Sequence, residues 1–227
     1  DIMLTRSLGQ TFMHDQNQLR KIVGLAKLTA ADHVIEIGPG LGSLTGLLLQ
    51  TAGHVTAVET DRRLDKLLDE RLGERSNFTL QHADAMKIVR KSKFDWSKHK
   101  LVANLPYSIA SPPLIDLAAS AGRPRRMIVT LQLEVVQRIL AQSATKEYGV
   151  LTLLIGLHYA TGESFVIPRG PFYPEPNVDS GCVELLRRET PLLPPELCPV
   201  FKKIVKRVFA ERRKKMMKLL MRDWPCP

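Results

Sequence analysis

The chain has 227 residues, a length that fits one main domain with a small appendage. Hydrophobic residues make up 44% and charged residues 25%, and no apolar run approaches the roughly 20 residues of a membrane span, so we expect a soluble protein. Most of the net charge of +10 comes from residues 200–222, which hold ten Lys or Arg and one acidic residue, Glu211. This excess favours a nucleic-acid partner, although a solvated basic helix face would have the same composition.

Three widely spaced cysteines, Cys182, Cys198 and Cys226, indicate neither a disulfide framework nor a zinc site of paired cysteines. We therefore predict no metal. The first residue is Asp1 and the first ten residues lack the apolar core of a signal peptide, so we expect a chain trimmed at that end and located in the cytoplasm.

Hydrophobic periodicity predicts alternating helices and strands. The first elements are a helix over 15–26, a strand over 33–37, a glycine turn, a helix around Leu44–Leu48 and a strand over 54–58. The later ones are strands over 78–81, 100–103, 127–133, 151–160 and 182–186, with helices around 64–72, 114–120 and 134–142. This alternation predicts a mostly parallel sheet covered by helices on both faces.

A change of pattern predicts a domain boundary after Arg188, because residues 189–199 hold four prolines. We therefore divide the chain into 1–188 and 189–227. The second part contains an amphipathic basic helix over 201–209. Its basic side chains are candidate RNA ligands: Lys202, Lys203, Lys206, Arg207, Arg212, Arg213, Lys214 and Lys215.

The run E-I-G-P-G-L-G at 36–42 follows the predicted strand over 33–37, and Glu59 ends the next strand. Glycines such as Gly38 and Gly40 let the backbone approach a ligand, and a carboxylate at the second strand end can bind both ribose hydroxyls. The G-x-G-x-G spacing favours S-adenosylmethionine over a nicotinamide dinucleotide, whose folds prefer G-x-G-x-x-G. A nicotinamide enzyme and a tight turn without a ligand remain alternatives.

Asp84 follows the predicted strand over 78–81, where its side chain can meet an adenine amino group at the carboxyl edge of the sheet. The same residue could instead cap the next helix.

The run N-L-P-Y at 104–107 follows the strand over 100–103. The amine of adenine is a poor nucleophile until hydrogen-bond acceptors draw its hydrogens out of the ring plane, and the Asn104 oxygen and the carbonyl of Leu105 or Pro106 could be those acceptors. Tyr107 could stack on an extruded base. In isolation the run could be a simple turn.

Several motifs in the same order resemble the ribosomal RNA adenine dimethyltransferase family, and the small-subunit, kasugamycin-sensitivity type in particular. The resemblance covers residues 8 to about 220. Besides Glu59, Asp84 and the runs at 36–42 and 104–107, it rests on G-Q-T-F-M at 9–13, E-Y-G at 147–149, F-Y-P-E-P-N-V-D-S at 172–180 and F-A-E-R-R-K at 209–214.

The resemblance implies a Rossmann-like class I methyltransferase fold with a seven-stranded sheet and a small, truncated helical domain that engages RNA. It implies that Phe172 packs on the flipped adenine opposite Tyr107, a position that we would otherwise assign to the core. The implied S-adenosylmethionine ligands are Gln10, Thr11, Met13, Gly38, Gly40, Glu59, Asp84 and Asn104.

Two departures from the family pattern affect these expectations. Thr11 and Met13 replace the asparagine and leucine of the usual G-Q-N-F-L, so a contact through the side chain of residue 11 is in question. The chain stops at Pro227, where relatives commonly continue further into the helical domain. Altered affinity or selectivity for RNA would follow, or the sequence is a cut version of a longer one.

The expected reaction is direct transfer of methyl groups to N6 of two adjacent adenosines near the 3′ end of small-subunit ribosomal RNA, by a monomer and without a metal. The alternatives are a large-subunit adenine methyltransferase and a methyltransferase-like module that binds RNA or DNA during ribosome assembly or transcription. A small-molecule methyltransferase would leave the basic tail unexplained.

Overall fold

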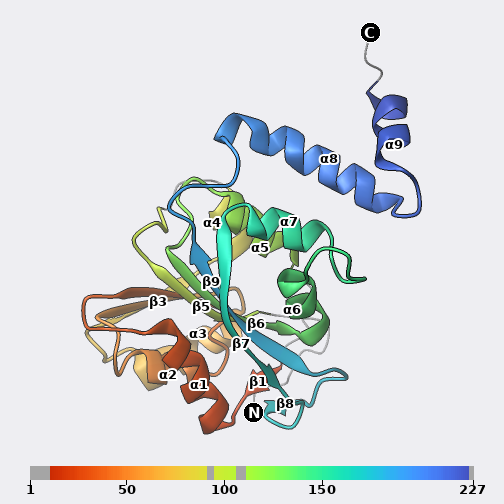
Figure 1. Cartoon of the computed structure of the whole chain (residues 1–227). Helices are drawn as coiled ribbons and strands as arrows, with labels where there is room; N and C mark the ends of the chain where they lie inside the picture. Colours follow the sequence, from red (N-terminus) through yellow and green to blue (C-terminus); the bar gives the residue numbers. More distant parts are fainter. Residues whose placement is uncertain (1–10, 91–94, 106–110, 225–227) are drawn as a thin grey trace.

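The computed structural model describes residues 11–90, 95–105 and 111–224. Its centre is a seven-stranded sheet in the order β4-β3-β2-β5-β6-β9-β7 (Figure 1). The strands are β2 (His33–Ile37), β3 (His54–Glu59), β4 (Phe78–His82), β5 (Lys100–Asn104), β6 (Arg126–Gln132), β7 (Tyr159–Ile167) and β9 (Ser180–Arg187). A separate two-stranded ribbon pairs β1 (Phe12–Met13) with β8 (Phe172–Tyr173).

Strands β2 to β6 run parallel, whereas β9 is antiparallel to both β6 and β7. The predicted mostly parallel, seven-stranded sheet is therefore confirmed. Because parallel strands end at one edge, the loops after β2, β3, β4 and β5 gather at what we call the carboxyl edge of the sheet. The opposite edge, where these strands begin, is the amino edge.

Helices cover both faces of the sheet, as predicted (Figure 1). Apolar residues of α1 and α2 pack with Val34, Val55 and Val102 on one face, and those of α5, α6 and α7 pack on the other. The helices are α1 (Gln16–Ala26), α2 (Ser43–Leu48), α3 (Arg62–Leu72), α4 (Ala85–Arg90), α5 (Ser111–Ala119), α6 (Leu133–Leu140), α7 (Val150–Gly156), α8 (Cys198–Ala210) and α9 (Met216–Asp223).

The strand predicted over 151–160 is wrong, because most of this segment forms α7 and β7 begins only at Tyr159. A continuous apolar run does not by itself distinguish a buried strand from a buried helix. Here Leu151, Leu154 and Ile155 lie at helical spacing and bury one face of α7. The helix satisfies its own backbone hydrogen bonds, and the sheet gains its last strand from the more polar residues that follow.

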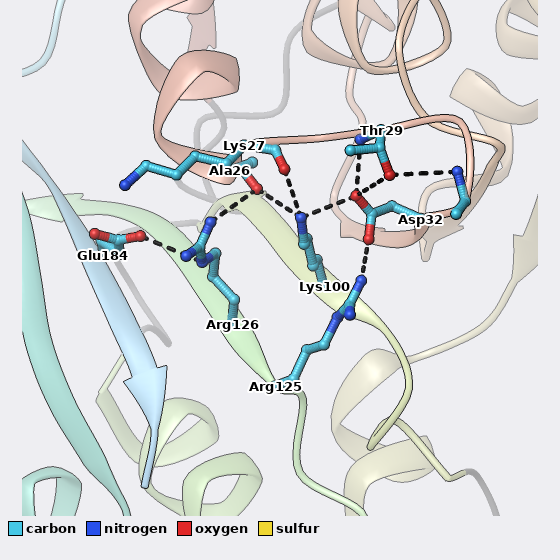
Figure 2. A network of polar contacts seen from close by, with 9 residues as sticks. Ala26, Lys27, Thr29, Asp32, Lys100, Arg125, Arg126 and Glu184 are labelled. Carbon is cyan, nitrogen blue, oxygen red and sulfur yellow. Dashed lines mark hydrogen bonds and ion pairs between the residues drawn. The ribbon is translucent and has the colours of Figure 1, made fainter.

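An ion-paired network closes the amino edge beneath the end of α1 (Figure 2). The ammonium of Lys100, at the start of β5, donates to the carbonyls of Ala26 (3.0 Å) and Lys27 (2.7 Å) and lies 2.9 Å from Asp32 Oδ2. Arg125 pairs with the other oxygen of Asp32. Asp32 is only 3% exposed, so this network fixes α1 to the beginnings of β2, β5 and β6.

The C-terminal segment begins after β9 ends at Arg187, and α8 then packs against α7 (Figure 1). The helix predicted over 201–209 lies within α8, and α9 follows it. The division into 1–188 and 189–227 stays a prediction. Within the described ranges, no helix is both long and apolar enough to cross a membrane.

Candidate active site

Hydrogen bonds between neighbouring loops assemble the carboxyl edge. The backbone N–H of Gly38 donates to Val58 O (2.9 Å), and that of Ala83 donates to Glu59 O (2.9 Å). On the other side, the N–H of Leu105 donates to Thr130 O (3.1 Å). Together with the pairing of β2 and β5, these bonds place the segments that carry the glycine run, Glu59, Asp84 and Asn104 at one edge.

The glycine loop adopts backbone angles that favour glycine. Gly38, Gly40 and Gly42 have φ values of 70°, 58° and 80°, in the left-handed region where a side chain is strained. At Gly40 a Cβ would lie 2.8 Å from the ring of Phe12, so the absence of a side chain also lets β1 approach the loop. Gly38 is partly exposed whereas Gly40 is buried against the Phe12 ring, so the contact of a ligand with this backbone stays a prediction.

Glu59 links the glycine loop to β3 through its carboxylate. One oxygen accepts from the N–H groups of Thr60 (2.8 Å) and Asp61 (2.9 Å), and the other accepts a longer bond of 3.4 Å from Gly40. Burial raises the pKa of Glu59, and these backbone N–H donors act in the opposite direction. The oxygen facing Gly40 retains acceptor capacity that a ribose hydroxyl could use.

Glu36 is a candidate site residue that sequence reasoning did not single out. Its side chain is 1% exposed, and no donor in the described part of the chain reaches Oε2. Burial raises its pKa to about 8, while the hydroxyl of Thr45 lowers it and the charge of Glu59 raises it further. The sequence did contain a signal for Glu36, because it is an acidic residue within an apolar strand that leads into the glycine run. Burying a carboxyl group costs free energy unless a ligand or a neighbouring side chain hydrogen-bonds to it.

Asp84 lies after β4 and is half-buried. Its Oδ1 accepts from the backbone N–H of Lys87 at 3.4 Å, so the helix-cap interpretation describes part of its role in α4. The cap does not exclude a ligand contact, because a carboxylate has two oxygens and about four acceptor directions. Its role toward adenine stays a prediction.

Asn104 ends β5 and reaches the N-terminal segment. Its Nδ2 donates to the carbonyl of Thr11 at 3.4 Å, while no described donor reaches its buried Oδ1. Val102 of β5 lies opposite Glu36 of β2, and Asn104, two residues further along, points to the same face. Two buried oxygens without donors therefore lie on one face of neighbouring strands at this edge.

The β1–β8 ribbon brings the segment around Thr11 to the segment around Phe172. Met13 lies opposite Phe172, and Phe12 lies opposite Tyr173. Met13 and Phe172 are 5% and 2% exposed and belong to the same hydrophobic cluster, whereas Tyr173 is 65% exposed. In this conformation Phe172 occupies the core position that its sequence alone suggested, and stacking on a base would require its exposure.

Other predicted residues can be placed only in part. Leu105 is 7% exposed and tied to β6 through its N–H. Gln10, Pro106 and Tyr107 lie outside the described residues, so their predicted roles stay predictions.

The candidate RNA ligands divide by their contacts within the chain. Lys202 lies 3.6 Å from Asp116 of α5, and Arg207 pairs with both Glu211 (2.8 Å) and Asp223. Lys203 lies over the Trp224 ring. The remaining members are Lys206, Arg213, Lys214 and Lys215, which are exposed, and Arg212, whose guanidinium binds backbone carbonyls.

The arrangement suits a nucleoside ligand that carries hydrogen-bond donors. It offers a glycine loop with positive φ angles, a carboxylate with spare acceptor capacity at Glu59, and two buried oxygens without a described partner at Glu36 and Asn104. Among the residues that the structure describes, no group of three or more His, Cys, Asp or Glu is arranged to hold a metal ion.

Comparisons with known proteins agree with these features. The family model described as ribosomal RNA adenine dimethylase matches residues 3–225. Ribosomal RNA small subunit methyltransferase A of Lactococcus lactis subsp. lactis (strain IL1403) is 40% identical over 222 residues, covering 96% of this chain and 76% of that protein.

Two crystal structures share the fold. A dimethyladenosine transferase from Plasmodium falciparum aligns with a TM-score of 0.77 at 26% identity, covering 93% of this chain and 75% of the other. The 23S rRNA methyltransferase ErmE aligns with a TM-score of 0.71 at 28% identity, covering 94% and 85%. The glycine loop, the N-L-P-Y strand end and the match over nearly the whole sequence lead to one conclusion: this chain belongs to the ribosomal RNA adenine dimethylase family.

Proposed function

We propose that the protein transfers methyl groups from S-adenosylmethionine to N6 of adenine in small-subunit ribosomal RNA, and that it dimethylates two adjacent adenosines near the 3′ end. The observation that carries this proposal is the buried Oδ1 of Asn104, which lacks a donor among the described residues and ends the strand next to the glycine loop. An exocyclic amine would supply the missing donor.

The glycine loop and two carboxylates would hold the cofactor. Gly38 and Gly40 would let the backbone approach it, and Glu59 would accept hydrogen bonds from the ribose hydroxyls. Asp84 would accept from the adenine amine of the cofactor. Glu36 fits the same ligand, because its buried Oε2 has no partner among the described residues and a positively charged ligand would lower the raised pKa of its carboxyl group.

Bound S-adenosylmethionine supplies an electrophilic methyl group on a positively charged sulfur. The protein would hold the target amine in line with that group and accept its hydrogens at Asn104 Oδ1 and at the carbonyl of Leu105 or Pro106. The contact from Asn104 Nδ2 to Thr11 O would fix the amide so that Oδ1 stays available. The proton can leave to solvent after transfer, so no strong base is required.

The C-terminal basic residues would contact the RNA backbone. Lys206, Arg213, Lys214 and Lys215 are exposed, and cations in such positions release counterions when they meet phosphates. Lys202, whose single ion pair with Asp116 is partly exposed, could exchange this partner for phosphate at small cost. The cytoplasm, where ribosomes assemble, is the setting that we propose.

A second candidate function is methylation of large-subunit RNA, because ErmE, named a 23S rRNA methyltransferase, shares the fold at 28% identity. The small-subunit proposal is favoured by the 40% identity to a protein named ribosomal RNA small subunit methyltransferase A. The two differ in the RNA that accepts the methyl group.

The test is methyl transfer from labelled S-adenosylmethionine to undermethylated small ribosomal subunits, with naked large-subunit RNA in parallel. We expect N6,N6-dimethyladenosine in the small-subunit RNA, identified by nucleoside mass analysis. Label in large-subunit RNA alone would favour the second candidate. Cofactor binding without transfer to either RNA would contradict both.

A further inference from the structure

The E-Y-G run at 147–149 and Arg212 of the F-A-E-R-R-K run have no role in the proposed reaction, and they lie in contact across the chain. Arg212, after α8, donates through Nη1 to the carbonyl of Lys146 (2.7 Å) and through Nη2 to the carbonyl of Tyr148 (3.0 Å). Both carbonyls belong to the loop between α6 and α7. A planar guanidinium can make two such diverging bonds at once, which a lysine ammonium does not reproduce.

An aromatic pair lies beside these solvent-exposed bonds. The rings of Phe209 and Tyr148 meet edge to face with centroids 6.2 Å apart, and the guanidinium of Arg212 lies 5.5 Å from the Phe209 centroid. A Cβ on Gly149 would lie 3.5 Å from the Phe209 ring, so the ring rests against the loop backbone. We call these contacts of Arg212 and Phe209 with residues 146–149 the Arg212 clamp.

Hydrogen bonds connect the Arg212 clamp to the C-terminal end of α6. The hydroxyl of Thr152 donates to Arg138 O (2.6 Å) and accepts from the N–H of Gly149 (3.2 Å), so the end of α6, the loop and the start of α7 form one unit.

The N-terminal end of α6 lies next to the candidate active site. The N–H of Leu133 donates to Asp179 O (2.9 Å) in the F-Y-P-E-P-N-V-D-S segment, and β6 immediately before it accepts from Leu105 through Thr130 O. A helix of eight residues spans about 12 Å. One short helix therefore connects the clamp to both segments that are predicted to border the target base.

Neighbouring basic residues differ from Arg212. Arg213, Lys214 and Lys215 are exposed, as Arg212 is, but within the described ranges their side chains make no hydrogen bond or ion pair. They follow Arg212 directly in the turn that leads to α9. The clamp therefore holds one end of this basic turn while leaving its other cations free for phosphates.

We propose that Arg212 is a positioning residue and not an RNA contact: the clamp sets the distance between the phosphate-binding turn at 213–215 and the target-base site. This rests on the proposed function. The charge of Arg212 then contributes little to RNA affinity, whereas its hydrogen-bond geometry determines how well the bound adenine reaches Asn104.

The first test compares Arg212→Lys with Arg138→Lys, a change at an exposed arginine of α6 whose side chain makes no hydrogen bond or ion pair within the described ranges. Both substitutions keep the charge. We expect Arg212→Lys to lower kcat on small subunits by between about 10-fold and 100-fold with little change in KM, since misplacement by about 1 Å can cost that much. Arg138→Lys serves as the control, with kcat and KM unchanged. Equal kcat values in the two variants would overturn the proposal.

The second test is the salt dependence of RNA binding. Each lost phosphate contact reduces the slope of log K against log salt by about 0.7 to 0.9. We expect this reduction in Lys214→Ala and no reduction in Arg212→Ala. A reduction in Arg212→Ala equal to that in Lys214→Ala would show that Arg212 binds phosphate and would overturn the proposal.

Failure of the proposed function is recognised separately, because wild-type protein would then methylate neither RNA. Hydrogen exchange still tests the clamp in that case. We expect the amides of residues 144–149 to exchange faster in Arg212→Lys than in wild type or Arg138→Lys. Unchanged exchange would contradict the clamp itself.

Discussion

At the amino edge of the sheet both oxygens of the buried Asp32 carboxylate have cationic partners, whereas at the carboxyl edge Glu36 and Asn104 each keep a buried oxygen that no described donor reaches. The two edges belong to the same strands, β2 and β5 (Figures 1 and 2). Buried polar groups are normally satisfied, so unsatisfied ones indicate either a cost that is tolerated or a partner that arrives later. The amino edge therefore serves stability, and the carboxyl edge is prepared for ligands.

The largest expected effect comes from breaking the amino edge. Asp32→Ala leaves the Lys100 ammonium buried beside carbonyls alone, and loss of one partner of a buried pair costs about 3 to 5 kcal/mol. Urea unfolding measures this loss.

The same carboxylate predicts a pH dependence of stability. Burial raises the pKa of Asp32, but hydrogen bonds from Lys100 and Thr29 lower it below 3.8. The stabilisation by ionised Asp32 is therefore present at neutral pH and is lost in acid.

A matched double variant separates the broken pair from general damage. Asp32→Ala combined with Lys100→Met removes both charges, and we expect it to recover part of the lost free energy of unfolding. If the free energy of unfolding of the double variant were well below that of Asp32→Ala, the unpaired Lys100 ammonium would not be the source of the destabilisation.

Glu36→Gln tests whether the buried carboxyl group of Glu36 destabilises the folded protein when it ionises. The folded pKa of about 8 lies above the usual 4.5, so the folded protein keeps a proton that the unfolded chain releases as pH rises between these values. The free energy of unfolding of wild type therefore falls relative to that of Glu36→Gln as pH rises across this range. Stability curves that stay parallel from pH 4.5 to pH 8 would contradict it.

A smaller effect is expected from Gly40→Ala in the glycine loop. The φ of 58° costs an alanine about 1 to 2 kcal/mol, and its Cβ would displace the Phe12 ring 2.8 Å away. We expect weaker binding of S-adenosylmethionine by calorimetry. Gly24→Ala in α1, where a Cβ has open space and φ is not in the left-handed range, is the control and should leave this affinity unchanged.

The smallest effect is expected where a charge pair lies on the surface. Lys27 and Glu163 are 3.8 Å apart with most of both side chains exposed, so Glu163→Ala should change the free energy of unfolding by less than about 0.5 kcal/mol. A loss similar to that of Asp32→Ala would mean that burial is not what distinguishes the amino-edge network.

The sequence predicted most elements of the fold because hydrophobic period and turn residues report local structure. It mistook α7 for a strand because LTLLIGLHYA is mostly apolar, and a buried helix and a buried strand favour the same apolar residues. The ion-paired amino edge was not predictable, since Asp32 and Lys100 are 68 residues apart and lie in no motif. Only the sheet register brings them together.

The residues of the candidate site likewise include some that the sequence predicted and some that it did not. The location of Glu59, Asp84 and Asn104 at one edge was predictable because parallel strands place their ends there, whereas their roles toward ligands stay predictions. Glu36 was missed because a residue inside a strand is usually assigned to packing. The role of Arg212 required tertiary contacts, because a basic run in sequence does not distinguish a cation that binds carbonyls from one that faces solvent.

The central claim is that the unsatisfied oxygen of Asn104 receives the target amine. Its most direct test is transfer from labelled S-adenosylmethionine to undermethylated small subunits by wild type and Asn104→Ala, with cofactor affinity measured on the same preparations. We expect Asn104→Ala to lose about 100-fold to 1,000-fold in the rate of dimethyladenosine formation while it remains folded. Dimethyladenosine formed at the wild-type rate by a folded Asn104→Ala protein would contradict the account.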